Sequence, residues 1–480
     1  MRRTKIVATL GPATDDPKVL REMFDAGLNV GRINFSHDDP DAHRRRTKMV
    51  RELARECDHE IGLMGDLQGP KIRIRRFADG PIMLDENDTF FLDSKLGKSD
   101  GNQEGVGVAY SKLHKDVRKG DRLLLNDGQI ELQVESIRNT RINTRVVIGG
   151  ELSDHKGINR QGGGLSASSL TKQDRENIKL AAELELDFLA VSFVRSAADV
   201  KKARKLLREA GGHGLIVAKI ERVEAVENID EIVQAADVIM VARGDLGVEM
   251  GYAELTGLQK KIIRKTRYAN KVVITATQMM ESMISNLTPT RAEVSDVANA
   301  VMDGTDAVML SAETAVGEFP VAVISTVARV CSGAEKHSLS VGRTTHRLDD
   351  RFDEVDEAIA MAVMYTANHL SVRAIIALTE SGSTTLWMSR IRSDIPIYAF
   401  TPHIATSRRV TMYRGVYPVR FISKRRSKEH IYEDTFATLK THELVDEGDL
   451  VIYTRGDLHG VAGATNTMKI IQVSFPNKKK

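Results

Sequence analysis

Short runs of β-branched and other apolar residues recur along the first 310 residues, separated by stretches whose apolar positions have helical spacing. We count eight such runs: Lys5–Thr9, Asn29–Asn34, Ile61–Asp66, Phe188–Phe193, Leu215–Glu221, Val238–Ala242, Val272–Thr277 and Ala307–Leu310. Strands that alternate with helices predict βαβ units and a parallel sheet. Eight such units can close into a (β/α)8 barrel, which we favour over an open, doubly wound sheet.

The spacing is regular except for about 120 residues between Asp66 and Phe188. There, alternating β-branched residues and turn pairs predict an inserted, antiparallel, mostly-β domain over residues 70–168. The chain would leave this lid through Gly162–Gly164, which we interpret as a permissive hinge rather than a phosphate-binding loop. Thr171 is then expected to cap the next helix.

A third unit follows a polar connector after the eighth run. A helical segment precedes five more short runs: Ala374–Leu378, Ile397–Phe400, Val416–Phe421, Leu450–Thr454 and Ile470–Val473. This pattern predicts an open α/β domain. The expected domains are therefore a barrel from 1–69 and 169–340, the lid at 70–168, and a C-terminal domain at 345–480.

The composition is typical of a soluble globular protein and gives no sign of a membrane or nucleic-acid-binding protein. An apolar fraction of 41% and a charged fraction of 28% are ordinary for a soluble globular chain. The net charge of +3 and the 5% aromatic content favour neither nucleic acid nor a membrane as partner. Two cysteines suit a reducing compartment, and no apolar run approaches the roughly 20 residues of a membrane helix. The apolar stretch at the start breaks at Gly11, too early for a signal peptide, so we expect a cytoplasmic protein.

The carboxyl ends of the eight predicted strands are unusually polar, and in such a barrel active sites gather at these ends. Residues two apart on a strand share a face. Side chains on a shared face are therefore expected to point together into the barrel mouth, in three sets: Arg32, Asn34 and Ser36; Lys219 and Glu221; Thr275 and Thr277.

These residue types indicate phosphoryl transfer. Glu221 and Asp245 end adjacent strands and supply hard oxygen ligands for Mg²⁺. Arg32 and Lys219 supply cations that would stabilise the charge on a phosphoryl group in transfer. No zinc-type cluster and neither common nucleotide-binding glycine motif occurs in the sequence. The alternative is a structural cluster of ion pairs.

Long motifs carry a resemblance to a known family. RINFSH, GDLQGPKIR, VAKIE, VARGDLGVE, TATQMMESM and DGTDAVMLSAETAVGEFP together resemble pyruvate kinase, collinearly from Lys5 to about Arg329. The resemblance implies phosphoryl transfer from phosphoenolpyruvate to ADP, giving pyruvate and ATP, in a TIM-barrel enzyme that is typically a homotetramer. A metal-dependent, aldolase-like lyase would not need Lys219 or the lid. An inactive effector-binding relative should have lost Lys219 or a metal carboxylate.

By this resemblance, Arg32 contacts the phosphoryl group, Lys219 stabilises its charge, and Glu221 and Asp245 bind Mg²⁺ or Mn²⁺. Backbone N–H groups of Gly244 and Asp245 would meet the substrate carboxylate. The remaining implied positions are Thr277, which would orient water for the protonation of the enolate, and the nucleotide contacts Asn34, His37, Arg73 and Lys156. The lid would close over the site and exclude water.

One departure concerns the monovalent cation. Many relatives hold K⁺ through positions matching Asn34, Ser36 and Asp66 with a threonine, and a glutamate lies nearby. Here the threonine position is Leu67 and the glutamate position is Lys71. An ammonium would repel K⁺, so we predict that Lys71 supplies the missing charge and that K⁺ is not required. The alternative is that Lys71 is a surface lysine and K⁺ still binds.

The C-terminal domain offers a second site after its first predicted strand. Hydroxyls, a glycine and a helix start form a reasonable phosphate cradle from Thr379, Ser381, Gly382, Ser383 and Thr384. In the family this loop binds the phosphate of an allosteric effector. Glu380 would repel a densely charged bisphosphate, so we expect a phosphorylated effector with one phosphate. An unliganded turn is the alternative.

Overall fold

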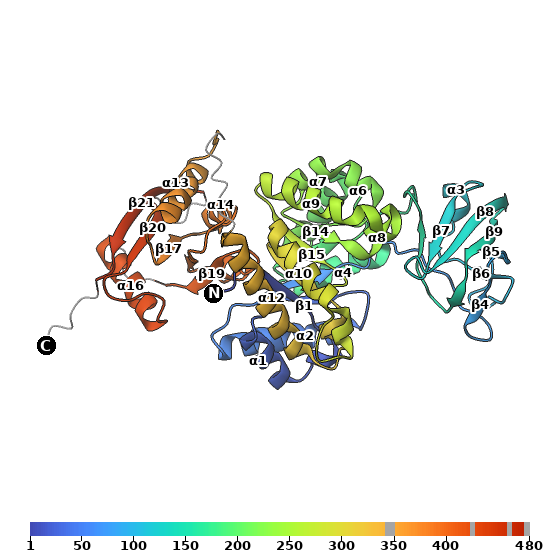
Figure 1. Ribbon diagram of the computed structural model, residues 1–480, viewed down its shortest axis with the longest axis horizontal. Helices are drawn as coiled ribbons and strands as arrows, with labels where there is room; N and C mark the ends of the chain where they lie inside the picture. The colour runs from blue at the N-terminus through green and yellow to red at the C-terminus, as the bar shows by residue number, and fades with distance from the viewer. Residues whose placement is uncertain (341–350, 423–427, 458–462, 475–480) are drawn as a thin grey trace.

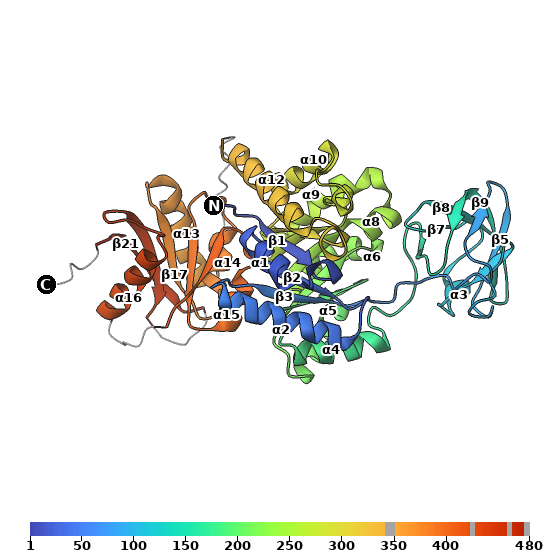
Figure 2. The ribbon, with the colours of Figure 1, turned by 90° about the horizontal axis from the view of Figure 1, so that it is seen from below.

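The computed structural model describes residues 1–340, 351–422, 428–457 and 463–474. The chain forms three bodies in a row, with the C-terminal unit at one end, the barrel in the middle and the β-rich unit at the other end (Figures 1 and 2). Residue 345, the expected start of the third domain, and the end of the chain lie outside the described residues.

The middle body is a closed barrel of eight parallel strands, so the barrel prediction is confirmed over an open sheet. Its hydrogen-bonded order is β1-β16-β15-β14-β13-β12-β3-β2. The strands are β1 (Lys5–Thr9), β2 (Val30–Asn34), β3 (Gly62–Asp66), β12 (Phe188–Val191), β13 (Leu215–Ile220), β14 (Val238–Ala242), β15 (Val272–Ala276) and β16 (Ala307–Leu310). β12 ends two residues earlier than predicted, because Phe193 adopts a φ of +55° that no strand continues.

Helices surround the barrel, and several of them begin with a side-chain cap. They are α1 (Pro17–Asp25), α2 (Pro40–Glu56), α4 (Lys172–Glu183), α5 (Ala197–Glu209), α6 (Val223–Glu227), α7 (Ile229–Ala235), α8 (Arg243–Met250), α9 (Tyr252–Tyr268), α10 (Arg291–Asp303), α11 (Ala312–Ala315) and α12 (Pro320–Ser340), with 3-10 turns η1 (Pro12–Thr14) and η2 (Glu281–Ile284). Thr171 caps α4 as predicted: its Oγ1 accepts a hydrogen bond from Asp174 N.

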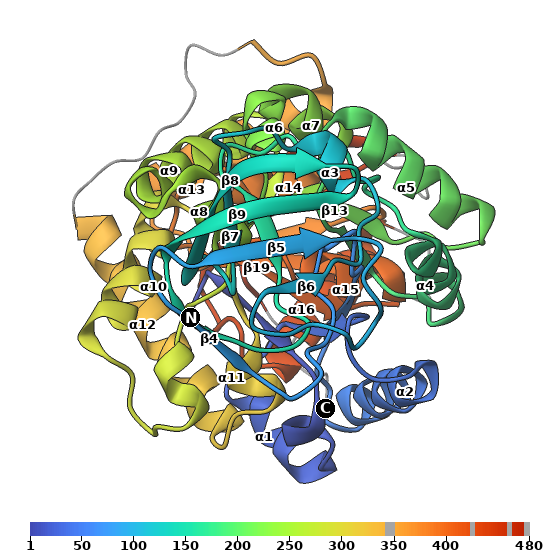
Figure 3. The same cartoon turned by 90° about the vertical axis from the view of Figure 1, so that its right-hand side faces the viewer.

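The inserted body is built from short strands and one helical turn. It comprises β4 (Ile82–Leu84), β5 (Thr89–Asp93), β6 (Gly105–Gly107), α3 (Leu113–Asp116), β7 (Arg122–Leu125), β8 (Ile130–Arg138), β9 (Arg141–Ile148), β10 (Gly150–Leu152) and β11 (Ile158–Arg160). β10 pairs with β4, and the larger sheet has the order β11-β7-β8-β9-β5-β6. Pairing is antiparallel as expected except between β5 and β6, which run parallel. Seen from its own end, this lid lies in front of the ring of barrel helices (Figure 3).

The C-terminal body is an open five-stranded sheet of order β19-β18-β17-β20-β21 with flanking helices. Its elements are α13 (Val355–His369), β17 (Ala374–Leu378), α14 (Ser383–Ser389), β18 (Ile397–Thr401), α15 (Ile404–Val410), β19 (Val416–Arg420), α16 (Lys428–Thr441), β20 (Leu450–Gly456) and β21 (Thr465–Gln472). β21 begins five residues before the predicted Ile470. It is an edge strand paired antiparallel to β20, and most of its residues after the buried Thr465 are partly or fully exposed.

A continuous apolar core joins the barrel to the C-terminal body. Inward residues at the amino ends of the barrel strands belong to the same buried cluster as α13 and α14. Charged groups reinforce this junction: the side chains of Arg390 and Asp306 are 1% and 2% exposed, and Arg390 Nη1 donates to Asp306 Oδ2 at 3.0 Å. The two bodies are therefore expected to move together. In the described part of the chain, no helix combines the length and apolarity needed to cross a bilayer.

Candidate active site

Side chains from the carboxyl ends of the barrel strands surround one cavity of about 220 Å³, beside the segment that leads into the lid. The predicted residues that line it are Arg32, Asn34, Ser36, His37, Asp66, Lys71, Arg73, Lys219, Glu221, Asp245 and Thr277. Gly244 and Lys156 are predicted site residues that do not. Ser192 also lines the cavity, although no role was predicted for it. Gln68, Met240 and Met309 in the lining were missed because alternation alone does not mark them.

Lys219 lies at the centre of the charged part of this cavity. Its ammonium donates to Ser192 Oγ at 2.6 Å and lies 3.4 Å from both Asp66 Oδ1 and Glu221 Oε2. Burial disfavours the charge, but Asp66 and Glu221 outweigh it, so the pKa of Lys219 lies above its usual value. The amine is therefore held charged at neutral pH and inside the site.

Arg32 is aimed by two buried partners. Its Nε donates to Asp66 Oδ2 at 2.8 Å, and its Nη1 donates to Thr9 Oγ1 at 2.8 Å. Burial alone would raise the pKa of Asp66, but Lys219 and Arg32 lower it below its ordinary value. Asp66 Oδ1 is buried without a hydrogen-bond partner. One carboxylate thus orients both cations toward the cavity.

Glu221 and Asp245 bring two carboxylates to the same cavity. Glu221 is 1% exposed, and its Oε1 accepts a hydrogen bond from Phe193 N at 2.6 Å. Burial raises the pKa of Glu221, Lys219 opposes this, and the negative charge of Asp245 adds to it. Two carboxylates that repel each other in a partly desolvated site are suited to binding a cation between them. Among the described residues, no group of three or more His, Cys, Asp or Glu side chains gathers as a metal site.

Thr277 follows β15 with a φ of +71°, a conformation that is rare for a β-branched residue and often marks a functional site. Its Oγ1 accepts from Gly244 N at 2.8 Å and donates to the Ala276 carbonyl at 2.6 Å. The expectation that Thr275 shares its face is wrong. Thr275 is fully buried outside the cavity against Thr305, because the positive φ breaks the alternation of the strand.

The predicted nucleotide contacts divide between the barrel and the lid. Asn34, His37 and Arg73 line the cavity. Lys156 lies beside Arg73 in the lid, where its carbonyl accepts from Ile74 N at 3.0 Å. Arg73 Nη1 donates to the carbonyl of His155 at 2.9 Å. Both lid cations therefore lie on one pair of adjacent chain segments at the edge of the lid.

Lys71 takes part in a different contact from the one that the sequence suggests for the monovalent-cation position. Its ammonium lies 3.1 Å from Asp245 Oδ1 and 3.6 Å from Asp127 Oδ1 in the lid. Burial would lower the pKa of Lys71, but Asp245 and Asp127 raise it above its usual value. Leu67 is 2% exposed and its side chain offers no oxygen. The structure thus places a positive charge between Asp245 of the barrel and Asp127 of the lid.

The predicted effector loop lies between β17 and α14. Gly382 N donates to Thr379 Oγ1 at 2.9 Å, and Gly382 has a φ of +88° that favours glycine. Ser383 N donates to Ser381 Oγ at 3.3 Å, and the hydroxyls of Thr384 and Thr465 share a hydrogen bond of 2.7 Å. All five hydroxyl and glycine positions therefore fold into one compact turn against β21.

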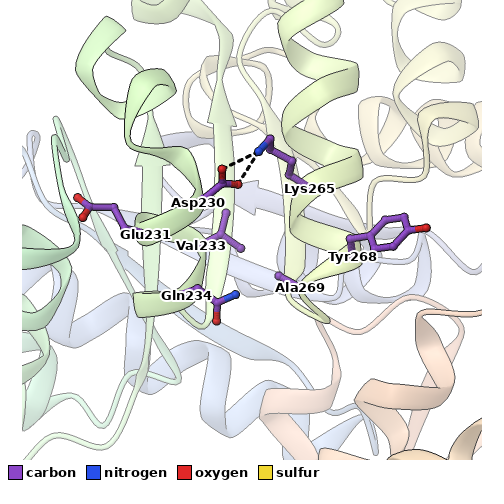
Figure 4. A pocket seen from close by; sticks show the side chains of 7 residues that line it. All are labelled: Asp230, Glu231, Val233, Gln234, Lys265, Tyr268 and Ala269. Carbon is purple, nitrogen blue, oxygen red and sulfur yellow. Dashed lines mark hydrogen bonds and ion pairs between the residues drawn. The ribbon is translucent and has the colours of Figure 1, made fainter. Parts of the chain in front are cut away.

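Two further features lie outside the barrel mouth. Glu380 in the effector loop contacts His403 Nε2 at 2.5 Å, so its charge faces a titratable partner. A separate surface groove of about 540 Å³ lies between α7 and α9, where Lys265 contacts Asp230 at 2.6 Å (Figure 4). This groove is lined by one exposed ion pair and a few helix residues, without the convergent charges of the barrel mouth.

Comparisons with known proteins agree with this geometry. The family models "Pyruvate kinase, barrel domain" and "Pyruvate kinase, alpha/beta domain" match residues 1–324 and 357–471. The chain is 52% identical to "Pyruvate kinase" of Buchnera aphidicola subsp. Acyrthosiphon pisum, over 98% of this chain and 99% of the relative. It is 52% identical to "Pyruvate kinase II" of Salmonella typhimurium with the same coverage, and 50% identical to "Pyruvate kinase" of Haemophilus influenzae over 97% of each.

Proposed function

Because the chain belongs to the pyruvate kinase family, a family of phosphotransferases acting on phosphoenolpyruvate and ADP, we propose that the barrel-mouth cavity is its catalytic site. The observation that carries the proposal is the arrangement around Asp66, where Arg32 and Lys219 are held as largely buried cations facing one cavity. The phosphorus–oxygen bond to the enol oxygen breaks, and a bond forms to a terminal oxygen of ADP.

Lys219 and Arg32 act on the charge of the moving group. The phosphoryl group carries negative charge on three oxygens during transfer, and preorganised cations stabilise it without reorganising at that moment. Arg32 is already oriented by Asp66 and Thr9, so it binds the phosphoryl group of the incoming substrate. Lys219 keeps its proton because two carboxylates surround it, and it stabilises the group in flight.

Glu221 and Asp245 would hold the divalent cation. The oxygen chemistry of the pair fits Mg²⁺ or Mn²⁺, which commonly binds one or two carboxylates and completes its shell with water and substrate oxygens. When bound, this ion supplies positive charge for the enolate and carboxylate oxygens of the substrate. Lys71 Nζ donates to Asp245 Oδ1 at 3.1 Å, so this ammonium would have to leave that oxygen for Asp245 to hold the ion.

Thr277 would orient the water that protonates the enolate carbon and completes pyruvate. A threonine hydroxyl is too weak an acid to donate alone at neutral pH, but its position beside Gly244 suits a relay. Substrate binding would release Gly244 N from Thr277 so that this N–H and that of Asp245 can meet the substrate carboxylate. Asn34, His37, Arg73 and Lys156 would bind ADP, the last two from the closing lid.

We propose that this chain does not need K⁺. Lys71 supplies a positive charge to the cavity, and Leu67 provides no side-chain oxygen to a monovalent ion. Initial rates are expected to be equal in Na⁺-free tetramethylammonium buffer and in KCl. An absolute requirement for K⁺ would end this proposal.

For regulation, we propose that the loop from Thr379 to Thr384 binds a phosphorylated metabolite with one phosphate. Its hydroxyls and backbone N–H groups suit one phosphate, and the carboxylate of Glu380 disfavours a second. The test titrates AMP, ribose 5-phosphate, a hexose 6-phosphate and fructose 1,6-bisphosphate against phosphoenolpyruvate saturation. Selective activation by the bisphosphate would refute the proposal.

The reaction itself is tested by coupling pyruvate formation to lactate dehydrogenase with purified protein. Omitting phosphoenolpyruvate, ADP or the divalent ion in turn should abolish the signal each time. Turnover that persists without ADP would instead indicate hydrolysis. We further propose a homotetramer, to be measured by light scattering. Its two thiols are free, Cys57 and Cys331, which suits work in the cytoplasm.

A further inference from the structure

A buried ion pair lies where the lid rejoins the barrel, outside the cavity described above. Arg222 Nε is 3.7 Å from Glu249 Oε1, and the two side chains are 3% and 2% exposed. Arg222 immediately follows Glu221, and Glu249 lies on α8, the helix that begins with Asp245 in its first turn. The pair therefore links the two chain segments that carry the candidate metal carboxylates.

The same two residues hold the returning segment of the lid, Arg222 through its side chain and Glu249 through its backbone carbonyl. Arg222 Nη2 donates to the Leu165 carbonyl at 3.0 Å, and the Glu249 carbonyl accepts from Gly162 N at 3.1 Å. Glu224 adds a contact, because its Oε1 accepts from Gly164 N at 2.8 Å and from Arg222 Nη2 at 3.2 Å. Side chains and backbone of the barrel thus bind the lid's return at three points.

The segment that they hold is built to bend. Gly162, Gly163 and Gly164 have φ values of +80°, +74° and +89°, a run that other residues adopt only with strain. A Cβ on Gly163 would lie 3.0 Å from Val223 Cβ. Without external contacts such a run has little intrinsic preference for one direction. The direction that the lid takes from the barrel must therefore come from the groups that bind this segment.

The Arg222–Glu249 pair is buried between the two connections of the lid, which suits a role in fixing their geometry. A small cavity of about 20 Å³ is lined by both connections of the lid, including Pro70 and Leu165, and by Arg222 and Glu249. Burial raises the pKa of Glu249 to about 7, while Arg222 opposes the shift. A buried pair of this kind is weak evidence for stability, but it selects one geometry well.

We propose that Arg222 and Glu249 are positioning residues that set the angle of the lid relative to the carboxylates Glu221 and Asp245. They would act through the glycine run and would not touch the substrates. Their effect reaches ADP through Arg73 and Lys156 on the lid, whereas phosphoenolpyruvate is gripped by barrel residues alone. This inference rests on the proposed function for its kinetic consequence, and on the structure alone for the hinge itself.

The test compares Arg222→Gln, Glu249→Gln and the double variant in the full-length protein. The KM for ADP should rise about tenfold in each single variant, and the double variant should be no worse than either. The affinities for phosphoenolpyruvate and for Mn²⁺ should stay within about twofold of the parent. Glu135→Gln is the matched control, because Glu135 forms an exposed pair with Arg145 on the lid at 2.6 Å.

Hydrogen exchange gives a readout that does not depend on turnover. Gly162 N donates to the Glu249 carbonyl and Gly164 N to Glu224 Oε1. The Arg222 side chain contacts both Glu224 and Glu249 and so holds these two acceptors in place. A peptide covering 159–165 should therefore exchange about tenfold faster in both single variants but not in Glu135→Gln. Unchanged exchange overturns the hinge role. Faster exchange with equal losses in ADP and phosphoenolpyruvate binding overturns the positioning role. If the parent turns over no substrate while exchange behaves as expected, the proposed function fails and the hinge stands.

Discussion

Replacing Lys219 by methionine removes one charge and keeps a side chain of similar length. The ammonium has three partners: the Ser192 hydroxyl at 2.6 Å, and the carboxylates of Asp66 and Glu221 at 3.4 Å each. Asp66 keeps its contacts with Arg32 after the change. Glu221 keeps the hydrogen bond from Phe193 N, but in the described part of the chain no other Lys or Arg nitrogen lies within 4.0 Å of it.

The expected loss of activity follows from the lost stabilisation of the moving phosphoryl group. A preorganised donor of this kind contributes roughly 3–4 kcal/mol, so kcat should fall by about 10²–10³-fold or more. The fold has a separate cost, because Glu221 is left as a buried carboxylate without its cation. Breaking a buried pair costs about 3–5 kcal/mol at most, and protonation of Glu221 limits that cost.

Two measurements separate these effects. The lactate dehydrogenase-coupled assay gives kcat and KM, and thermal unfolding followed by circular dichroism shows whether the variant is folded at the assay temperature. Lys202→Met makes the same chemical change at an exposed position on α5 and should leave both unchanged. A folded Lys219→Met protein with kcat within about tenfold of the parent would refute the reasoning.

Three further outcomes are expected. Arg390→Met should lower the free energy of unfolding by about 3–5 kcal/mol in urea titrations, because it strands the buried Asp306, and adding Asp306→Leu should recover most of the loss. Thr277→Val should lower kcat by about 10²-fold with little change in the KM for phosphoenolpyruvate, and Thr277→Ser should restore it. Burial lowers the pKa of Lys5 to about 7, so between pH 7 and its ordinary 10.5 the unfolded chain holds the extra proton and stability rises with pH. The stability of Lys5→Met relative to the parent, measured as the difference in urea midpoints, should therefore be greatest at about pH 7. This relative gain should disappear by about pH 10.

Much of the fold could be read from the chain because its signals are local. The eight barrel strands begin within one residue of their predicted starts, since β-branched runs between amphipathic helices leave few other arrangements. The cap at Thr171 was predictable for the same reason. Errors occurred where the local signal was weak, as in the polar edge strand β21, which apolar content alone does not mark.

Some residues of the candidate site could likewise be predicted from local patterns in the sequence, and others could not. Alternation along β2 and β13 correctly brought Arg32 and Lys219 to one cavity. It failed at Thr275, because the backbone of Thr277 turns to a positive φ and reverses which side chain faces inward. Such a conformation is imposed by neighbours: Arg243 Nη2 donates to the Thr277 carbonyl at 2.6 Å. No pattern in the sequence around Thr277 predicts that hydrogen bond.

The sequence alone determined the order and type of the elements, the family, and which charged residue types are available at the strand ends. Periodicity, capping and long motifs are properties of neighbouring residues, so they survive without coordinates. Only the tertiary structure decided which charges meet. Lys71 contacts Asp245, and Arg222 contacts Glu249, although 174 residues separate the first pair. Ion pairs depend on distance and burial, and both arise only when distant segments of the chain come together in the folded protein.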